Sequence, residues 1–159
     1  METIRKQVEN FLFYNKFASV ATVYQGKPFN SKVRYASDGL NIFFATLKTT
    51  DKVQSILESQ EVALTIDADS VDKFIQYYGN AILLNSQAEI SDATRVISRV
   101  YKYVKYWRSE PNVMYFRIEP VSIKYTIAKR TKPEVGNFFG DVYVLDEKNN
   151  WGGSDISEQ

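Results

Sequence analysis

Three consecutive stretches that alternate between apolar and polar residues constrain most strongly how this chain can fold. FASVATVY (17–24) ends at a Gln-Gly pair, KPFNSKVRYA (27–36) ends at Ser-Asp-Gly, and LNIFFAT (40–46) follows at once. Side chains along a strand point alternately to two faces, and short glycine-containing turns join antiparallel neighbours. The pattern therefore predicts an antiparallel meander with one buried face.

The rest of the chain adds helices and further strands. Apolar residues at helical spacing predict helices over 2–16, 51–59 and 91–107, the last of them capped by Ser91. Alternating, β-favouring residues predict strands over 61–67, 74–90 and 113–127, with a bulge or close backbone approach at Gly79. Hairpin-linked strands with few helices predict a closed or half-closed antiparallel barrel.

The length predicts a single domain, because 159 residues are enough for one sizeable core. Residues 1–128 carry the strand and helix patterns, and we assign them to a barrel domain. Residues 129–159 lose the periodicity and end in an acidic, glycine-rich stretch. We interpret them as a C-terminal tail, partly ordered at FFGDVYVL (138–145) and disordered at its end.

The composition excludes several kinds of chemistry. The chain has no cysteine and no histidine, and its net charge is +1. Disulfides and thiol chemistry are therefore absent, as are the commonest general base, metal ligand and heme ligand, and no metal site is predicted. No apolar run reaches the length of a membrane span, and the polar start METIRKQVEN lacks the apolar core of a signal peptide. We expect a cytoplasmic protein with no membrane partner.

The junction FFATLKTTDKV (43–53) concentrates hydroxyl and ammonium groups between a strand and a helix. Free backbone N–H groups at a helix start favour an anion, hydroxyls can donate to it, and lysines add charge. Thr46, Thr49, Thr50 and Lys52 could together hold a phosphate. An ordinary loop, with a threonine as N-cap and solvated lysines, accounts for the same residues.

The order of these parts resembles the pyridoxamine 5'-phosphate oxidase-like family of FMN-binding split barrels, over about Phe17 to Ile127. In that family a strand ending in aromatic-x-Thr is followed by a short loop, with Ser or Thr and then Lys entering a helix. The resemblance implies a mainly β fold with flanking helices, a six-stranded antiparallel split β-barrel. It also implies an FMN cofactor and a homodimer that builds the flavin site across its two-fold interface.

The resemblance also implies which residues contact the cofactor. The second strand would lie along the flavin and its ribityl chain, the junction would bind the phosphate, and a glutamine before Gly-x-Ala would reach the ribityl or phosphate. Asp51 stands where the family often has an arginine, so one phosphate ligand is lost. An outward-facing strand position explains the charges of the second strand equally well. The implied cofactor residues are Asn30, Ser31, Lys32, Val33, Arg34, Ala45, Thr46, Thr49, Thr50, Lys52 and Gln76.

The resulting functional hypothesis is an FMN flavoprotein, an oxidoreductase acting on an unidentified small-molecule substrate. The family's vitamin B6 oxidases close with an Arg- and His-containing segment that this chain lacks, so we do not expect pyridoxamine phosphate oxidation. The alternative is a split-barrel binding protein without turnover, or with a lost or different cofactor. The basic, tyrosine-rich segment RVISRVYKYVKYWR (95–108) could contact nucleic acid, but the near-neutral net charge favours a solvated helix face and no nucleic-acid partner.

Overall fold

The computed structural model describes residues 2–68, 73–107, 109–129, 139–146 and 150–156. The helices are α1 (Ile4–Tyr14), α2 (Asp51–Glu58), α3 (Gln87–Ile97) and the short 3-10 helix η1 (Lys102–Trp107). The strands are β1 (Phe17–Tyr24), β2 (Lys27–Arg34), β3 (Ala36–Asp38), β4 (Asn41–Leu47), β5 (Glu61–Asp67), β6 (Lys73–Leu84), β7 (Val113–Lys129), β8 (Phe139–Leu145) and β9 (Trp151–Ile156).

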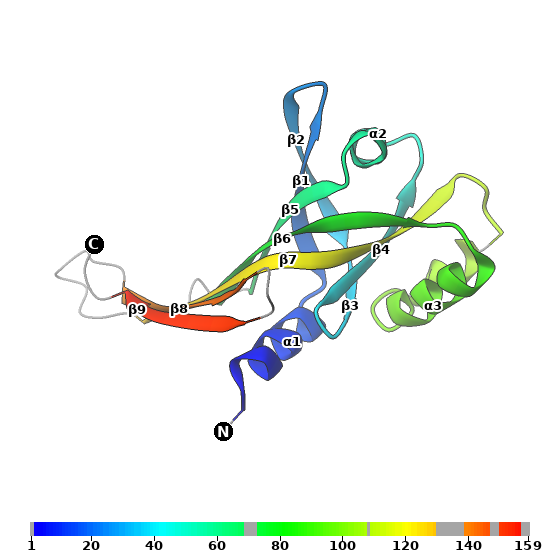
Figure 1. Ribbon diagram of the computed structural model, residues 1–159. Coiled ribbons are helices and arrows are strands. Elements are labelled where there is room, and N and C mark those ends of the chain that lie inside the picture. The colour runs from blue at the N-terminus through cyan, green and yellow to red at the C-terminus, as the bar shows by residue number, and fades with distance from the viewer. Residues whose placement is uncertain (1, 69–72, 108, 130–138, 147–149, 157–159) are drawn as a thin grey trace.

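All strands belong to one antiparallel sheet with the order β2-β1-β5-β6-β7-β4-β3, and β8 and β9 continue it from β7. The predicted meander is present, and Gln25 and Gly26 both have positive φ values of 50° and 76°, as the tight β1–β2 hairpin requires. Figure 1 shows β6 and β7 running through the middle of the sheet, with the β8–β9 arm at one end and α3 at the other. The mainly β fold with flanking helices is confirmed.

The sheet has more strands than the six that the sequence predicted. The predicted second strand breaks at Tyr35, whose buried hydroxyl donates to the carbonyl of Leu12 at 2.8 Å, and β3 begins after it. Two further strands, β8 and β9, form a hairpin that pairs with the end of β7. The stretch predicted to be ordered in the tail contains β8, whereas β9 was not predicted. β9 lies within the acidic, glycine-rich end that was predicted to be disordered, so that prediction was wrong for Trp151–Ile156. Residues 157–159 lie outside the described residues.

The prediction was wrong about where β6 ends and α3 begins. β6 stops at Leu84, not at Ile90, and Ser86 caps α3 by accepting a hydrogen bond from the Glu89 N–H at 3.1 Å. Serine followed three residues later by glutamate is a helix-start signal that competes with the strand pattern there. The helix also ends at Ile97, and η1 replaces its predicted last turns.

Two apolar clusters hold the sheet and helices together. The larger one fills the space between the barrel strands, α1 and α2, and includes the fully buried rings of Tyr35, Phe44, Tyr77 and Phe116. The smaller one lies between α3, η1 and the outer ends of β4 and β7, around Phe43, Val96 and Tyr115. The second cluster fixes α3 and η1 beside the carboxyl end of β4.

Gly79 lies at the point where the β6–β7 pairing shifts register. A Cβ atom built there would overlap the carbonyl oxygen of Glu119 and would come within 2.9 Å of side-chain atoms of Tyr77 and Ile118. The predicted bulge or close approach is therefore confirmed. The neighbouring Tyr77 hydroxyl is within hydrogen-bonding distance of the carbonyls of Leu40 (2.8 Å) and Ile118 (3.0 Å), which ties the β3–β4 turn to this crossing.

We expect Gly79→Ala to lower the free energy of unfolding by about 3 kcal/mol or more, because the methyl group meets backbone that cannot rotate away. Gly152→Ala in β9 is the matched control, since a Cβ there meets nothing within 4 Å. It should change stability by less than about 0.5 kcal/mol. Urea unfolding followed by circular dichroism measures both, and equal effects would contradict the close approach.

Candidate functional site

The junction between β4 and α2 forms a compact turn. The Thr50 hydroxyl donates to the carbonyl of Leu47 at 2.9 Å, and the side chain of Thr50 does not cap the helix. The Thr50 carbonyl accepts from the N–H of Val53 at 3.1 Å, which starts the helix. Thr49 is exposed. The turn therefore uses the hydrogen of the Thr50 hydroxyl for its own structure, and directs Thr46 and Lys52 toward each other.

Lys52 and Thr46, two of the junction residues that the sequence analysis considered for a phosphate, contact each other directly. The Lys52 Nζ donates to the Thr46 Oγ1 at 3.3 Å. Burial lowers the pKa of the Lys52 amine below its usual value, and the nearby Asp51 carboxylate acts in the opposite direction. A half-buried cation whose contact is with a neutral hydroxyl is a natural partner for an anion.

This pair forms one wall of a small cavity, which we name the inner chamber. Its volume is about 250 Å³. It lies between β2, β4, the start of α2 and the α3–η1 segment, and it brings together six of the predicted cofactor residues. The lining residues are Lys32, Val33, Arg34, Ala45, Thr46, Lys52, Ile97, Tyr101 and Trp107.

The inner chamber has a positive lining. Lys32, Arg34 and Lys52 contribute cations, and none of the described residues that line it is Asp or Glu. Two of these cations make cation–π contacts with aromatic rings. The Lys32 Nζ lies 4.4 Å from the Phe17 ring centroid, and the Arg34 guanidinium lies 5.3 Å from the Tyr101 ring centroid. The chamber is therefore suited to an anionic group beside a flat ring.

Five predicted cofactor residues do not line the inner chamber: Asn30, Ser31, Thr49, Thr50 and Gln76. Asn30 shares the alternating face of β2 with Lys32 and Arg34, and so lies further along the same strand. Gln76 pairs with Thr65 and Lys124 in the middle of the sheet. Leu84 on β6 pairs with Tyr115 on β7, and Tyr115 pairs with Ala45, which lines the inner chamber. Gln76 lies eight residues from Leu84, or about 26 Å along β6, and is therefore far from the inner chamber.

A second cavity continues from the first, and we name it the outer chamber. It has a volume of about 710 Å³ and shares Ala45, Thr46 and Trp107 with the inner chamber. Its remaining lining residues are Leu47, Tyr106, Glu110, Asn112 and Val113. The sequence did not mark Glu110 and Asn112 as site residues. The only signal was the aromatic-rich KYVKYW segment that becomes η1.

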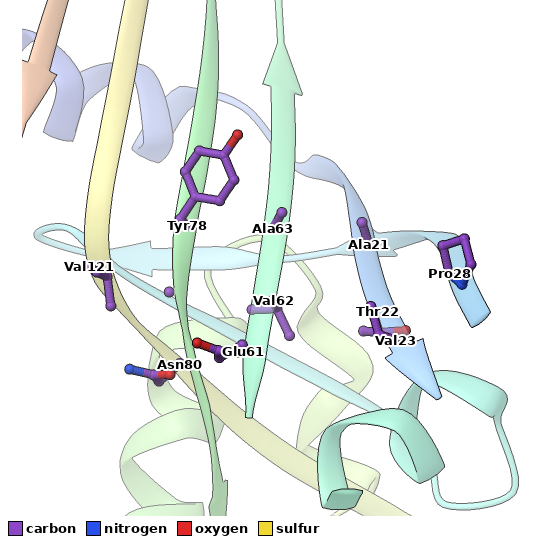
Figure 2. A pocket seen from close by; sticks show the side chains of 11 residues that line it. Ala21, Thr22, Val23, Pro28, Glu61, Val62, Ala63, Tyr78, Asn80 and Val121 are labelled. Atoms are coloured by element: carbon purple, nitrogen blue, oxygen red, sulfur yellow. The ribbon is translucent and has the colours of Figure 1, made fainter. Parts of the chain in front are cut away.

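A third feature is a groove on the sheet, which shares no lining residue with the two chambers (Figure 2). β1 and β5 pair over three residues only, ending at Ala21 and Ala63, and then diverge. A groove of about 390 Å³ opens there, with Ala21, Ala63 and Gly79 in its lining. Val23 and Tyr78 also line it and are 52% and 51% exposed. None of the predicted cofactor residues lines this groove.

Two general features bear on the site. Among the described residues no group of three or more acidic, histidine or cysteine side chains is placed to hold a metal ion. In the same part of the chain, no helix has the length and apolar character needed to cross a membrane.

Comparison with known proteins agrees with the fold. The family described as pyridoxamine 5'-phosphate oxidase matches residues 4–127 of this chain. The chain belongs to the pyridoxamine 5'-phosphate oxidase family. A curated relative, General stress protein 26 of Bacillus subtilis, is 28% identical over 135 residues, which covers 83% of this chain and 94% of that protein.

Solved structures share the split-barrel fold of the family at low sequence identity. A pyridoxamine 5'-phosphate oxidase-related, FMN binding protein from Nostoc punctiforme has a TM-score of 0.68 at 12% identity, over 99% of this chain and 98% of that one. A heme binding protein from Mycobacterium smegmatis has a TM-score of 0.70 at 10% identity, over 99% and 92%. The predicted split barrel is therefore confirmed, and at these identities the likeness concerns the fold alone.

We expect the Lys52 amine to affect the stability of the protein as a function of pH. Its folded-state pKa is lowered from the ordinary value, so the unfolded chain binds the proton more tightly. Stability should therefore rise as pH increases from the folded-state pKa of Lys52 toward about 10.4. Lys52→Gln should remove this contribution. Urea unfolding of both proteins between neutral pH and pH about 10.5 gives the difference, and parallel pH profiles would contradict a lowered pKa.

Proposed function

We propose that this protein is an FMN-binding flavoprotein that acts as an oxidoreductase on a small molecule. The observation that carries the proposal is the inner chamber, where Lys32, Arg34 and Lys52 converge with the Thr46 hydroxyl and no described lining residue is acidic. Membership of the family supports a flavin, and one protein with the same fold is described as FMN binding. We place the protein in the cytoplasm as part of this proposal, and the near-neutral net charge of +1 supports the absence of a nucleic-acid partner.

The residues present fit a flavin phosphate. Lys52 and Thr46 would hold the phosphate, with the second charge neutralised by Lys32 or Arg34. Val33 and Ala45 offer apolar contacts, and Tyr101 offers a ring face, to the remainder of the cofactor. When bound, the flavin supplies the two-electron redox chemistry, and the protein supplies binding and orientation.

A heme ligand fits these residues less well than a flavin. The fold alone does not separate the two, because a heme binding protein shares it. The chain contains neither histidine nor cysteine, which supply most axial heme ligands.

A binding protein without turnover is the second candidate. Its support is that the described lining of the inner chamber contains no carboxylate or histidine to move a proton. Asp51 next to Lys52 also opposes the binding of an anion. Reduction of the bound flavin by a nicotinamide donor, followed by reoxidation with a candidate substrate, separates the two candidates.

Lys52→Ala should weaken FMN binding about ten- to a hundred-fold, since a charge-assisted contact is worth about 1.5–3 kcal/mol. Riboflavin, which lacks the phosphate, should be affected much less. Thr46→Val should act in the same direction but more weakly, because its hydroxyl is neutral. Titration of both flavins, followed by flavin fluorescence, measures these effects.

Lys48→Ala is the matched control, because Lys48 is exposed and does not line the inner chamber. It should change FMN affinity by less than about three-fold. Equal weakening of FMN and riboflavin by Lys52→Ala, or no binding of either by the wild type, would mean that the junction is an ordinary loop.

We further propose a homodimer formed through the sheet groove. The small residues Ala21, Ala63 and Gly79 lie beside the exposed side chains of Tyr78 and Val23. A protruding ring next to a hollow is a self-complementary surface that two copies can share about a two-fold axis. Gln76 lies on the same strand as Tyr78 and far from its own chamber, so in such a dimer it would serve the chamber of the partner.

Tyr78→Asp should shift the protein from dimer to monomer at micromolar concentration, because it places a charge in the apolar contact. Tyr14→Asp is the control, as Tyr14 is 76% exposed on α1 and does not line the groove. Light scattering measures the mass of each. A wild-type monomer, or a dimer in both variants, would rule out this interface.

A further inference from the structure

The two chambers adjoin each other but differ in charge. The inner chamber has three cations and no acidic residue among its described lining residues. The outer chamber has one carboxylate, that of Glu110, and no cation among the described residues that line it. The shared residues Ala45, Thr46 and Trp107 carry no charge and form the boundary between the two.

The outer chamber is held in shape by its own hydrogen bonds. The Glu110 N–H donates to the carbonyl of Trp107 at 3.0 Å, and the Val113 N–H donates to the carbonyl of Glu110 at 3.2 Å. The carbonyl of Asn112 accepts from the Lys48 N–H at 2.8 Å, which fixes this turn to the end of β4. The cavity is therefore built from braced backbone and not from a single movable side chain.

Its walls are mostly apolar and include two aromatic rings. Leu47 and Val113 are cross-strand partners on β4 and β7, and Tyr106 and Trp107 end η1. Tyr106 is 65% exposed and Leu47 is 53% exposed, a large apolar area to leave in contact with water. A flat organic molecule that covers these side chains would remove that area from water.

Glu110 supplies the polar end of the cavity. Its exposed carboxylate stands at the chamber wall, and its Oε1 accepts from the N–H and the side-chain amide of Asn112, both at 3.4 Å. A cation near this wall is Lys105, which does not line the chamber and whose Nζ lies 5.2 Å from the centroid of the Tyr106 ring. The arrangement favours a ligand with a hydrogen-bond donor or a positive charge over an anion.

We propose that the outer chamber is a second ligand site, which binds a flat aromatic molecule that is cationic or neutral and rejects aromatic acids. The site does not depend on flavin in the inner chamber, so it goes beyond the proposed function. Where the proposed function holds, this selectivity defines the substrate class, because the adjoining cavity would hold the cofactor. Phosphate- and carboxylate-bearing molecules are then directed to the inner chamber and excluded from the outer one.

Three naphthalenes of matched shape test the charge preference: 1-naphthylmethylamine, 1-naphthalenemethanol and 1-naphthoate. We expect the amine to bind with a Kd of about 0.1–1 mM, the alcohol more weakly, and the carboxylate weakest. Titrations followed by amide and indole N–H shifts in NMR spectra give both affinity and place. The indole of Trp107 should shift, and that of Trp151, which does not line the chamber, is the internal reference.

Two pairs of variants assign the binding to this cavity. Glu110→Gln keeps an oxygen acceptor for Asn112 and should weaken the amine about two- to five-fold while leaving the alcohol unchanged. Glu89→Gln, on α3 outside the chamber, should change neither. Tyr106→Ala should weaken the amine and the alcohol alike, whereas Tyr103→Ala, which removes the ring stacked on Tyr106 at 6.4 Å but not a wall, should have little effect.

The outcomes separate this proposal from the proposed function. Lys52→Ala should weaken the binding of FMN and leave the binding of the amine unaffected. If the wild type binds the amine but not FMN, only the flavin assignment is overturned. Preference for the carboxylate, insensitivity to Glu110→Gln, or shifts that do not include Trp107 would each overturn the second ligand site.

Discussion

The structure depends on the pairing of β7 with three other strands. β6 pairs along most of its length, β4 pairs with its first residues, and β8 pairs with its last. The register of the β4–β7 pairing places Leu47 opposite Val113, so the end of β4 and the turn before β7 must meet at one place. Both chambers lie there. Gly79 allows β6 and β7 to approach closely while their register shifts, and this bend sends the other half of β7 away from the site as an arm (Figure 1).

The site follows from what the strand ends bring together. β2 contributes cations because its outward face carries Lys32 and Arg34, and α2 contributes Lys52 because the helix begins five residues after Thr46. The α-helix α3 ends at Ile97, and η1, which follows it, places the rings of Tyr106 and Trp107 beside the site. The charges of the two chambers come from different elements. The cations of the inner chamber come from β2 and α2, and the carboxylate of the outer chamber comes from the turn after η1. A change in that turn could alter which molecules the outer chamber accepts without disturbing the inner one.

The sequence was enough to predict the meander and the strand-to-helix junction at α2, because these features depend on residues close together in the chain. It was not enough for α3, where Ser86 and Glu89 start a helix inside a stretch whose apolar residues also suit a strand. It also missed β9, whose glycines disfavour a strand until β8 offers a partner. The outer chamber could not have been predicted from the sequence, because it depends on the pairing of Leu47 with Val113, which lie 66 positions apart in the chain. The position of Gln76 likewise depends on strand register, which no local pattern specifies.

Lys52 shows why the proposed phosphate site would favour an anion. Its ammonium group is partly removed from water, and the hydrogen bond described for it goes to the neutral oxygen of Thr46. Burial disfavours the charged form, as the lowered pKa records, and the Asp51 carboxylate offsets this only in part. Replacing Asp51 by arginine would add a cation and remove that offset, leaving two uncompensated charges in the protein without its ligand. Asp51 therefore lowers the affinity for an anion and raises the stability of the protein without a ligand. On this argument Asp51→Arg should bind FMN more tightly and unfold more easily when flavin-free, two opposite changes that flavin titration and urea unfolding can measure on the same sample.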